Sequence, residues 1–325
     1  MSDSLLQVDD LFVDIVTPSG TLKVVRGASF SIERGETLCL VGESGCGKSM
    51  TALAVMGLLP QTAQRRAHGL FFHGKNLASR EIAGPLRGRH MVMVFQEPMT
   101  ALNPVYTIGD QLAEVHRRHL GSSRAAARVR ANELLEKVGI SGAAERMQQY
   151  PHQLSGGLRQ RVMIAMALMC SPSLLIADEP TTALDVTVQA QILRLLVDLQ
   201  RDLGIAILLI THDLGVVSRV AHRVAVMYAG EIVEVGNTAS VFAGPRHPYT
   251  RGLMAAIPTL DKNVGERMGT ISGTVPSLLG GIQGCAFRFR CQHAQSACED
   301  PVAWKTELTH SWRCVIPSSM QTDAL

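Results

Sequence analysis

The feature that most constrains the fold is a glycine-rich loop at residues 42–49, which reads Gly-Glu-Ser-Gly-Cys-Gly-Lys-Ser. An apolar run at 38–41 precedes this loop, and a helical pattern at 50–59 follows it. Between a strand and a helix, such a loop turns successive backbone N–H groups toward phosphate oxygens at the positive helix end. The sequence therefore predicts an α/β layer that carries a nucleotide-phosphate site.

Two side chains of the loop suit a magnesium nucleotide. Lys48 offers a positive charge to the β- and γ-phosphates, and Ser49 offers a hydroxyl ligand to Mg²⁺. The expected nucleotide-binding set consists of Gly42, Glu43, Ser44, Gly45, Cys46, Gly47, Lys48, Ser49 and Met50.

Residues 1–243 alternate short apolar runs with amphipathic helical patterns, which is typical of a layered α/β domain. The apolar runs predict buried strands at 37–41, 91–95, 174–177 and 205–210. The helical patterns predict helices at 108–119, 123–138, 162–169 and 189–203. Ser123 is the expected N-cap of the second helix, and Gly204 is the expected C-cap of the last. A β-hairpin is expected over 224–235, with its turn at Ala229-Gly230.

Two carboxylates follow the buried run at 174–177. Asp178 suits Mg²⁺ coordination, because Mg²⁺ prefers hard oxygen ligands, and Glu179 is placed to deprotonate an attacking water. Alone, this pair would read as an exposed strand end. Because the glycine-rich loop at 42–49, a P-loop, lies upstream, we interpret Glu179 as the catalytic base.

A second phosphate-binding surface is expected at residues 154–161, Leu-Ser-Gly-Gly-Leu-Arg-Gln-Arg. Ser155 can cap the helix that follows, and Gly156 and Gly157 expose backbone N–H groups at its positive end. This octapeptide is similar to the signature sequence of ABC transporter ATP-binding subunits, and the chain resembles that family.

The resemblance implies further roles in the order that the family uses. Gln96 resembles the Q-loop glutamine, which senses Mg²⁺ and the membrane subunits, and His212 resembles the switch histidine on the γ-phosphate. Ala183-Leu184-Asp185 resembles the D-loop, so Asp185 joins the nucleotide-binding set. The implied catalytic residues are Lys48, Gln96, Glu179 and His212, and the implied Mg²⁺ ligands are Ser49, Gln96 and Asp178.

The family also implies a fold and a dimer. The fold is a RecA-like core with an antiparallel β-subdomain and a helical subdomain, here about 97–170. In the dimer, two chains enclose two ATP molecules, and Ser155–Gly157 of one chain faces the nucleotide on the partner's P-loop. The family usually stacks an aromatic residue on adenine; here that position falls at Ile15 or Val16, and Phe12 is out of register.

Three strings, at 96–104, 180–189 and 247–254, resemble those of dipeptide and oligopeptide importers, and the P-loop resembles the "D"-type ATPase of such systems. This implies ATP-driven import of peptides, with nickel complexes or other small solutes as the alternative cargo. The implied partners are a second ATPase in a heterodimer, two transmembrane permeases and an extracytoplasmic solute-binding protein. The implied location is peripheral, on the cytoplasmic face of the inner membrane.

Composition argues against other classes. The 31 basic and 28 acidic side chains give a net charge of +3, which is too even for nucleic-acid binding. No apolar run is long enough to span a membrane and the first residues are acidic, so a soluble intracellular protein is expected. A non-transport ABC ATPase is disfavoured, because neither a coiled-coil insertion nor a second ATPase domain is present.

Beyond residue 243, frequent glycine and proline predict a small loop-rich module at 244–325. It holds four of the seven cysteines, spaced C-x5-C-x6-C-x15-C: Cys285, Cys291, Cys298 and Cys314. The spacing is a weak zinc signal, whereas four thiolates satisfy a [4Fe–4S] cluster. Tails of this kind in peptide importers resemble cluster-binding modules, so a [4Fe–4S] cluster is expected, with free or disulfide-prone thiols and zinc as alternatives.

Overall fold

The computed structural model describes residues 4–96, 101–182, 184–257 and 271–316. They form two compact units, each built from segments that are distant in the sequence. The first unit contains residues 33–37 and 75–210, and the second contains residues 4–32, 38–74 and the chain from residue 211 onward. No helix in the described part of the chain is long and apolar enough to cross a bilayer.

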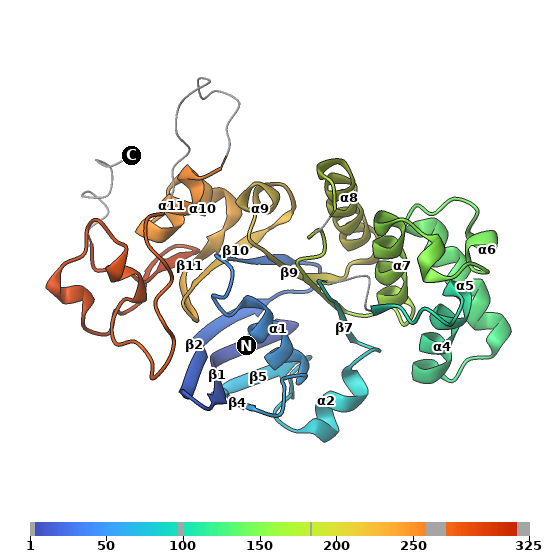
Figure 1. Ribbon diagram of the computed structural model, residues 1–325, viewed down its shortest axis with the longest axis horizontal. Helices are drawn as coiled ribbons and strands as arrows, with labels where there is room; N and C mark the ends of the chain where they lie inside the picture. The colour runs from blue at the N-terminus through green and yellow to red at the C-terminus, as the bar shows by residue number, and fades with distance from the viewer. Residues whose placement is uncertain (1–3, 97–100, 183, 258–270, 317–325) are drawn as a thin grey trace. The chain divides into compact units, whose positions relative to one another are not determined.

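The first unit combines parallel strands with a group of helices (Figure 1). Its elements are β6 (Lys75–Asn76), α2 (Arg80–Leu86), β7 (Met91–Val94), α4 (Ile108–Leu120), α5 (Arg124–Lys137), α6 (Ala143–Arg146), the 3₁₀ helix Pro151–Gln153, α7 (Gly156–Leu168), β8 (Leu174–Asp178), α8 (Val186–Leu203) and β9 (Ala206–Thr211). Strand β8 lies between β7 and β9 and runs parallel to both. Every residue of β8 is buried, as expected for a strand covered on both faces.

Capping residues fix the helix ends of this unit. Ser123 accepts a hydrogen bond from the backbone of α5, as predicted from the sequence, and Ser155 does the same for α7. The signature helix α7 therefore begins at Gly156, earlier than the expected Val162. Helix α8 ends at Gly204, which adopts a left-handed conformation (φ 62°) and donates its N–H to the Gln200 carbonyl, so this predicted cap is confirmed.

The second unit contains two sheets. Its elements are β1 (Leu6–Thr17), β2 (Gly20–Ile32), β3 (Thr37–Val41), α1 (Lys48–Met56), β4 (Ala63–Arg66), β5 (Gly69–Phe72), α9 (Leu214–Val220), β10 (Arg223–Tyr228), β11 (Glu231–Asn237), α10 (Thr238–Ala243), α11 (Pro248–Ala255), the 3₁₀ helices Ala286–Phe289 and Ser296–Cys298, β12 (Lys305–Glu307) and β13 (His310–Trp312). Strand β1 pairs antiparallel with β2, β4 and β5 in the first sheet. In the second sheet, β3 runs parallel to β10, and β10 pairs antiparallel with β11. Strand β13 then pairs antiparallel with β11 on one side and with β12 on the other.

The predicted hairpin is formed by β10 and β11. Its turn residues Ala229 and Gly230 have φ angles of 47° and 86°, the positive pair that a two-residue type I′ turn requires. The Gly230 N–H donates to the Cys46 carbonyl at 2.9 Å, so the hairpin tip supports the glycine-rich loop.

Both the pairing of β13 with β11 and several buried side chains hold the segment after α11. Trp312, Cys314 and Ile316 form a small core cluster against which Cys291 packs. Nearby, the fully buried Glu234 carboxylate accepts from the backbone N–H groups of residues 246 and 247 and lies 2.7 Å from His310 Nε2. These partners compensate the cost of burying a carboxylate. They also tie the start of α11 to β11 and β13.

Candidate functional site

The glycine-rich loop connects the buried strand β3 to α1 in the second unit. Lys48 is only 5% exposed, and its Nζ donates to the carbonyl oxygens of Gly42 (2.8 Å) and Glu43 (3.0 Å). The Lys48 ammonium therefore lies over the inner side of the loop. A phosphate group bound by the loop amides would meet this charge directly.

Two glycines of the loop permit close backbone packing. A Cβ atom on Gly42 would lie 2.1 Å from the Met227 carbonyl oxygen, and one on Gly47 would lie 2.4 Å from the Val24 carbonyl oxygen. Gly47 also has a φ of 104°, which side chains disfavour. Strands β2 and β10 thus fix the path of the loop at both ends.

The acidic pair lies in the first unit, where β8 ends. Asp178 is 6% exposed, and the next residue, Glu179, has a φ of 45°, which is uncommon for a residue with a side chain. The Glu179 carboxylate accepts hydrogen bonds from the Thr182 hydroxyl (2.9 Å) and from the Gln96 amide (3.4 Å). The structure therefore brings Gln96 and Glu179 together, although they are distant in the sequence.

The signature segment and the D-loop also lie in the first unit. Ser155 and Gly156 are exposed, Gly157 is half-buried, and the Ser155 hydroxyl accepts from the Leu158 N–H at 3.4 Å. Asp185 is exposed and accepts from the Val188 N–H at 2.9 Å, so it caps α8. Ala183 of the D-loop lies outside the described residues.

The remaining predicted nucleotide residues lie in the second unit. Ser49 and Met50 are half-buried in the first turn of α1, and His212 is exposed just before α9. Ile15 is half-buried on β1, where it pairs with Leu22 and Ala63. Phe12 stacks under the Arg66 guanidinium, 5.2 Å from ring centroid to Cζ. The nucleotide-site roles assigned from the sequence to these residues remain predictions.

The four cysteines of the tail line one small cavity in the second unit, together with His247, Phe287 and Val302. The cavity has a volume of about 10 Å³, which is room for about one water molecule. Burial raises the pKa of Cys285 to about 11 and raises those of Cys291 and Cys314, so neutral thiols are favoured. Across the described ranges, no group of three or more His, Cys, Asp or Glu side chains is arranged to hold a metal ion.

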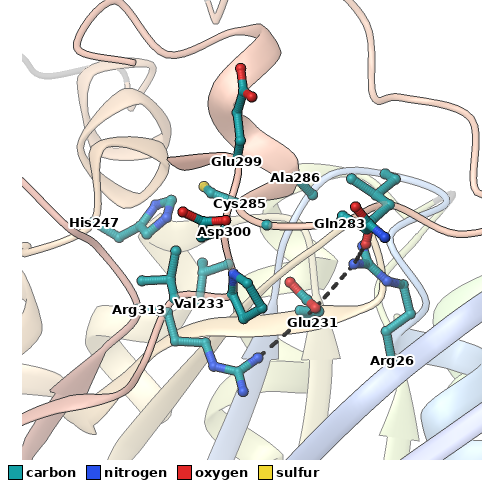
Figure 2. Close-up of a pocket in the computed structure, with 14 residues that line it drawn as sticks. Arg26, Glu231, Val233, His247, Gln283, Cys285, Ala286, Glu299, Asp300 and Arg313 are labelled. Atoms are coloured by element: carbon teal, nitrogen blue, oxygen red, sulfur yellow. Dashed lines mark hydrogen bonds and ion pairs between the residues drawn. The ribbon is translucent and has the colours of Figure 1, made fainter. Parts of the chain in front are cut away.

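A larger cavity of about 490 Å³ adjoins this cysteine cavity (Figure 2). Glu231 lies between two guanidinium groups, 3.1 Å from Arg26 and 4.0 Å from Arg313. Burial raises the pKa of Glu231, although the two arginines oppose this shift. Cys285 lines both cavities and is therefore the thiol that connects them.

Sequence reasoning missed two residues that contact the glycine-rich loop. The Glu43 N–H donates to the Tyr249 hydroxyl at 2.9 Å, and the Glu43 carboxylate forms an ion pair with Arg290. The string at 247–254 had pointed to a family but not to this contact. Within it, His247 caps α11 by accepting the Tyr249 N–H, and Pro248 begins the helix.

Comparison with known proteins gives two family matches. Residues 25–182 match the ABC transporter family, and residues 233–298 match the C-terminal region of oligopeptide/dipeptide transporters. Among solved structures, CbiO1 of Clostridium perfringens, part of an ABC transporter complex, has a TM-score of 0.63 at 29% identity over 74% of this chain and 92% of that chain. A dimeric ATP-binding cassette solved with ADP and phosphate has a TM-score of 0.63 at 23% identity, over 72% of this chain and 98% of that chain, and supports the fold alone.

The relatives with the higher identity are transport proteins. The chain is 50% identical to the dipeptide transport ATP-binding protein DppD of Bacillus subtilis, over 91% of this chain and 89% of that protein. It is also 50% identical to the oligopeptide transport ATP-binding protein OppD of Escherichia coli, over 91% of this chain and 88% of that protein. The expected ABC ATPase fold and the expected family are therefore confirmed. The chain belongs to the family of ATP-binding proteins of dipeptide and oligopeptide ABC transporters.

Proposed function

We propose that the chain hydrolyses ATP and that this hydrolysis powers the import of di- or oligopeptides by an ABC transporter. The observation that carries hydrolysis is the arrangement at the end of β8. There, Glu179 follows the buried Asp178, and its carboxylate is oriented by Thr182 and Gln96. The names of the relatives support peptides as the cargo.

Each residue has a role that its chemistry allows. The loop amides and Lys48 bind the phosphates, and Glu179 accepts the proton of the attacking water. Mg²⁺ supplies charge that offsets the phosphate oxygens, and Ser49, Gln96 and Asp178 offer the oxygen ligands it prefers. His212 would contact the γ-phosphate. Little else is needed, because phosphoryl transfer depends mainly on positioning and charge.

The signature segment supports a partner ATPase. Ser155 and Gly156 are exposed at the N-terminus of α7, whose amides favour an anion. We therefore assign these residues to a nucleotide held by the P-loop of a second ATPase subunit, in a heterodimer.

Exposed apolar side chains in the first unit support contact with membrane subunits. Phe95, Val105 and Tyr106 are 42%, 71% and 57% exposed; in the sequence, Phe95 precedes Gln96 and the other two precede α4. Exposed apolar side chains can supply contact area for a partner protein. We assign this surface to two permease subunits, which would hold the chain at the cytoplasmic face of the inner membrane, while an extracytoplasmic binding protein delivers the peptide.

The test uses the whole transporter. The two ATPases, the permeases and the peptide-loaded binding protein are reconstituted in vesicles, and ATP hydrolysis and uptake of labelled dipeptides and pentapeptides are measured. Peptide should stimulate both, and both should fall when this chain carries Glu179→Gln. Uptake of nickel complexes without peptide uptake would contradict the assigned cargo but leave the ATPase intact.

We also propose that Cys285, Cys291, Cys298 and Cys314 are the ligands of a [4Fe–4S] cluster. Four sulfur atoms around one cavity are the donor set that such a cluster takes. In this arrangement the cavity is too small for a cluster and the described residues hold no ready metal site, so cluster binding requires the thiols to move apart. Anaerobically purified transporter should contain about four irons per copy of this chain. Cys291→Ser should remove them and Cys170→Ser should not; zinc at one per chain, or iron-free protein, would contradict the assignment.

A further inference from the structure

Glu43, the second residue of the P-loop, is held by the tail of the chain at two points. Its side chain forms a bidentate ion pair with Arg290, at 2.6 Å and 3.0 Å. Its backbone N–H donates to the Tyr249 hydroxyl at 2.9 Å. All of these residues belong to the second unit.

Every nitrogen of the Arg290 guanidinium donates a hydrogen bond. Besides the two bonds to Glu43, it donates to the carbonyl oxygens of Ile271 and Ser272, each at 2.9 Å, and lies 3.5 Å from the Tyr228 hydroxyl. The Arg290 side chain is 4% exposed. A buried, bidentate arginine of this kind holds its partner in one geometry, which lysine cannot reproduce.

Tyr249 is rigidly packed as well. It is fully buried, and its ring centroid lies 4.6 Å from that of Tyr228 and 5.4 Å from that of Phe287. Phe287 also lines the cysteine cavity, so the ring that packs against Tyr249 belongs to the tail that holds the four thiols. The hydroxyl that meets Glu43 therefore has a fixed position.

The loop needs such support at this point. Ser44 and Gly45 are exposed, and a Cβ atom on Gly45 would meet nothing within 4 Å. Glycine-containing segments without packing partners lose more entropy when they become ordered. In addition, Glu43 places a negative charge in a loop that receives phosphates, and this charge repels them unless a cation offsets it.

We propose that Arg290 is a positioning residue of the ATP site, which holds and neutralises Glu43 while Tyr249 fixes the backbone beside it. The tail that carries the four cysteines is then a structural part of the nucleotide site. This inference rests on ATP binding by the P-loop, and it does not depend on the identity of the transported solute.

The experiment measures binding of MANT-ATP to the full chain, together with KM and kcat in the assembled ATPase. Arg290→Gln should raise the Kd about tenfold or more, because it leaves the Glu43 charge unpaired beside the phosphates. The double variant Glu43→Gln/Arg290→Gln should recover to within about threefold of wild type, since the charge is removed. KM should follow the Kd, while kcat stays close to wild type.

Two further variants separate this role from general stability. Arg290→Lys keeps the charge but loses the fork, and should give an intermediate Kd, about threefold above wild type. Tyr249→Phe keeps the ring and removes the hydroxyl, and should weaken binding about two- to fivefold. Arg246→Lys is the matched control: it alters an ion pair of 2.9 Å with Glu307 in the same unit and should leave the Kd unchanged.

The outcomes are distinct. Folded Arg290→Gln and Tyr249→Phe proteins with wild-type Kd would overturn the inference, as would a double variant weaker than either single variant. A wild-type chain that bound no MANT-ATP would overturn the ATP-site assignment together with the inference. If the variants change the Kd as expected but the transporter imports no peptide, only the proposed cargo is overturned.

Discussion

The P-loop and the cysteine-containing tail are both built from irregular segments, yet different groups hold them. The P-loop is fixed by its backbone, because β3 and α1 flank it and the carbonyls of Val24 and Met227 pack against its glycines. Residues 285–316 contain only two 3₁₀ helices and two three-residue strands, and a small cluster around Trp312 forms their core. The P-loop is therefore held by a few glycines and, at Glu43, by two tail side chains, whereas the tail depends on individual buried side chains of its own.

The variant with the largest effect changes catalysis and lies in neither the P-loop nor the tail. Glu179→Gln should lower kcat about 10²- to 10⁴-fold, because the general base is lost. The Kd for ATP should stay near wild type, and the closed dimer with the partner ATPase should accumulate. Phosphate release and MANT-ATP titration measure the two quantities. Glu114→Gln, an exposed carboxylate of the same unit, is the control, and near-normal turnover of Glu179→Gln would assign the base to another residue.

The next effect falls on the P-loop alone. Lys48→Ala should weaken ATP binding about ten- to a hundredfold, since charge-assisted hydrogen bonds to the phosphates are lost. Isothermal titration of the full chain measures the affinity. The unfolding of the tail should stay unchanged, and its fluorescence reports this directly, because Trp304 and Trp312 are the only two tryptophans of the chain. A parallel loss of tail stability would show that Lys48 also supports the tail.

A third variant acts on the tail. Cys298 is 5% exposed, and Cys298→Ser should destabilise the tail by about 1–3 kcal/mol, because a buried hydroxyl without a partner replaces the thiol. Tryptophan fluorescence during thermal unfolding measures the loss, and Cys170→Ser, in the other unit, should not change it. The kcat should change little. The KM for ATP should rise, because Arg290 of the tail holds Glu43 at the ATP site. An unchanged midpoint would show that the tail does not depend on this thiol.

The smallest effect is a pH dependence of the stability of the tail against unfolding. Burial lowers the pKa of His247 to about 4, despite the nearby Glu234 charge. The unfolded chain, with a histidine pKa near 6.5, then binds more protons between about pH 4 and 6.5, so stability falls as the pH drops through this window. Between pH 7 and 5.5 the loss should be about 1 kcal/mol.

The same tryptophan signal, recorded over this pH range, measures the effect. His247→Asn should flatten the curve, because asparagine does not titrate and its oxygen can still cap α11. A variant with the same pH slope as wild type would assign the protonation to another group.

The sequence predicted the parts that are local. Strand β3, the cap of α5 and the Ala229-Gly230 turn each depend on a few neighbouring residues, and each is confirmed. The helix after the P-loop ends at Met56 rather than Leu59, because Gly57 turns left-handed (φ 65°) and closes it.

The contacts of Glu43 were not predictable in this way. Tyr249 and Arg290 are far from Glu43 in the sequence and lie beyond a segment without periodic pattern, so no local rule sets their approach. The boundary near residue 243 and the nucleotide-site roles depend on similar long-range relations, and they stay predictions.

The carbonyl partners of Lys48 have a consequence for ligand selection. A ligand that draws the ammonium toward itself takes it from the Gly42 and Glu43 oxygens, and each such hydrogen bond has a net worth of about 0.5–1.5 kcal/mol. A polyanion with phosphates at the loop offsets this loss, whereas a nucleoside or a monophosphate offers little charge in return. We therefore expect the loop to favour ligands with more phosphates over nucleosides and monophosphates.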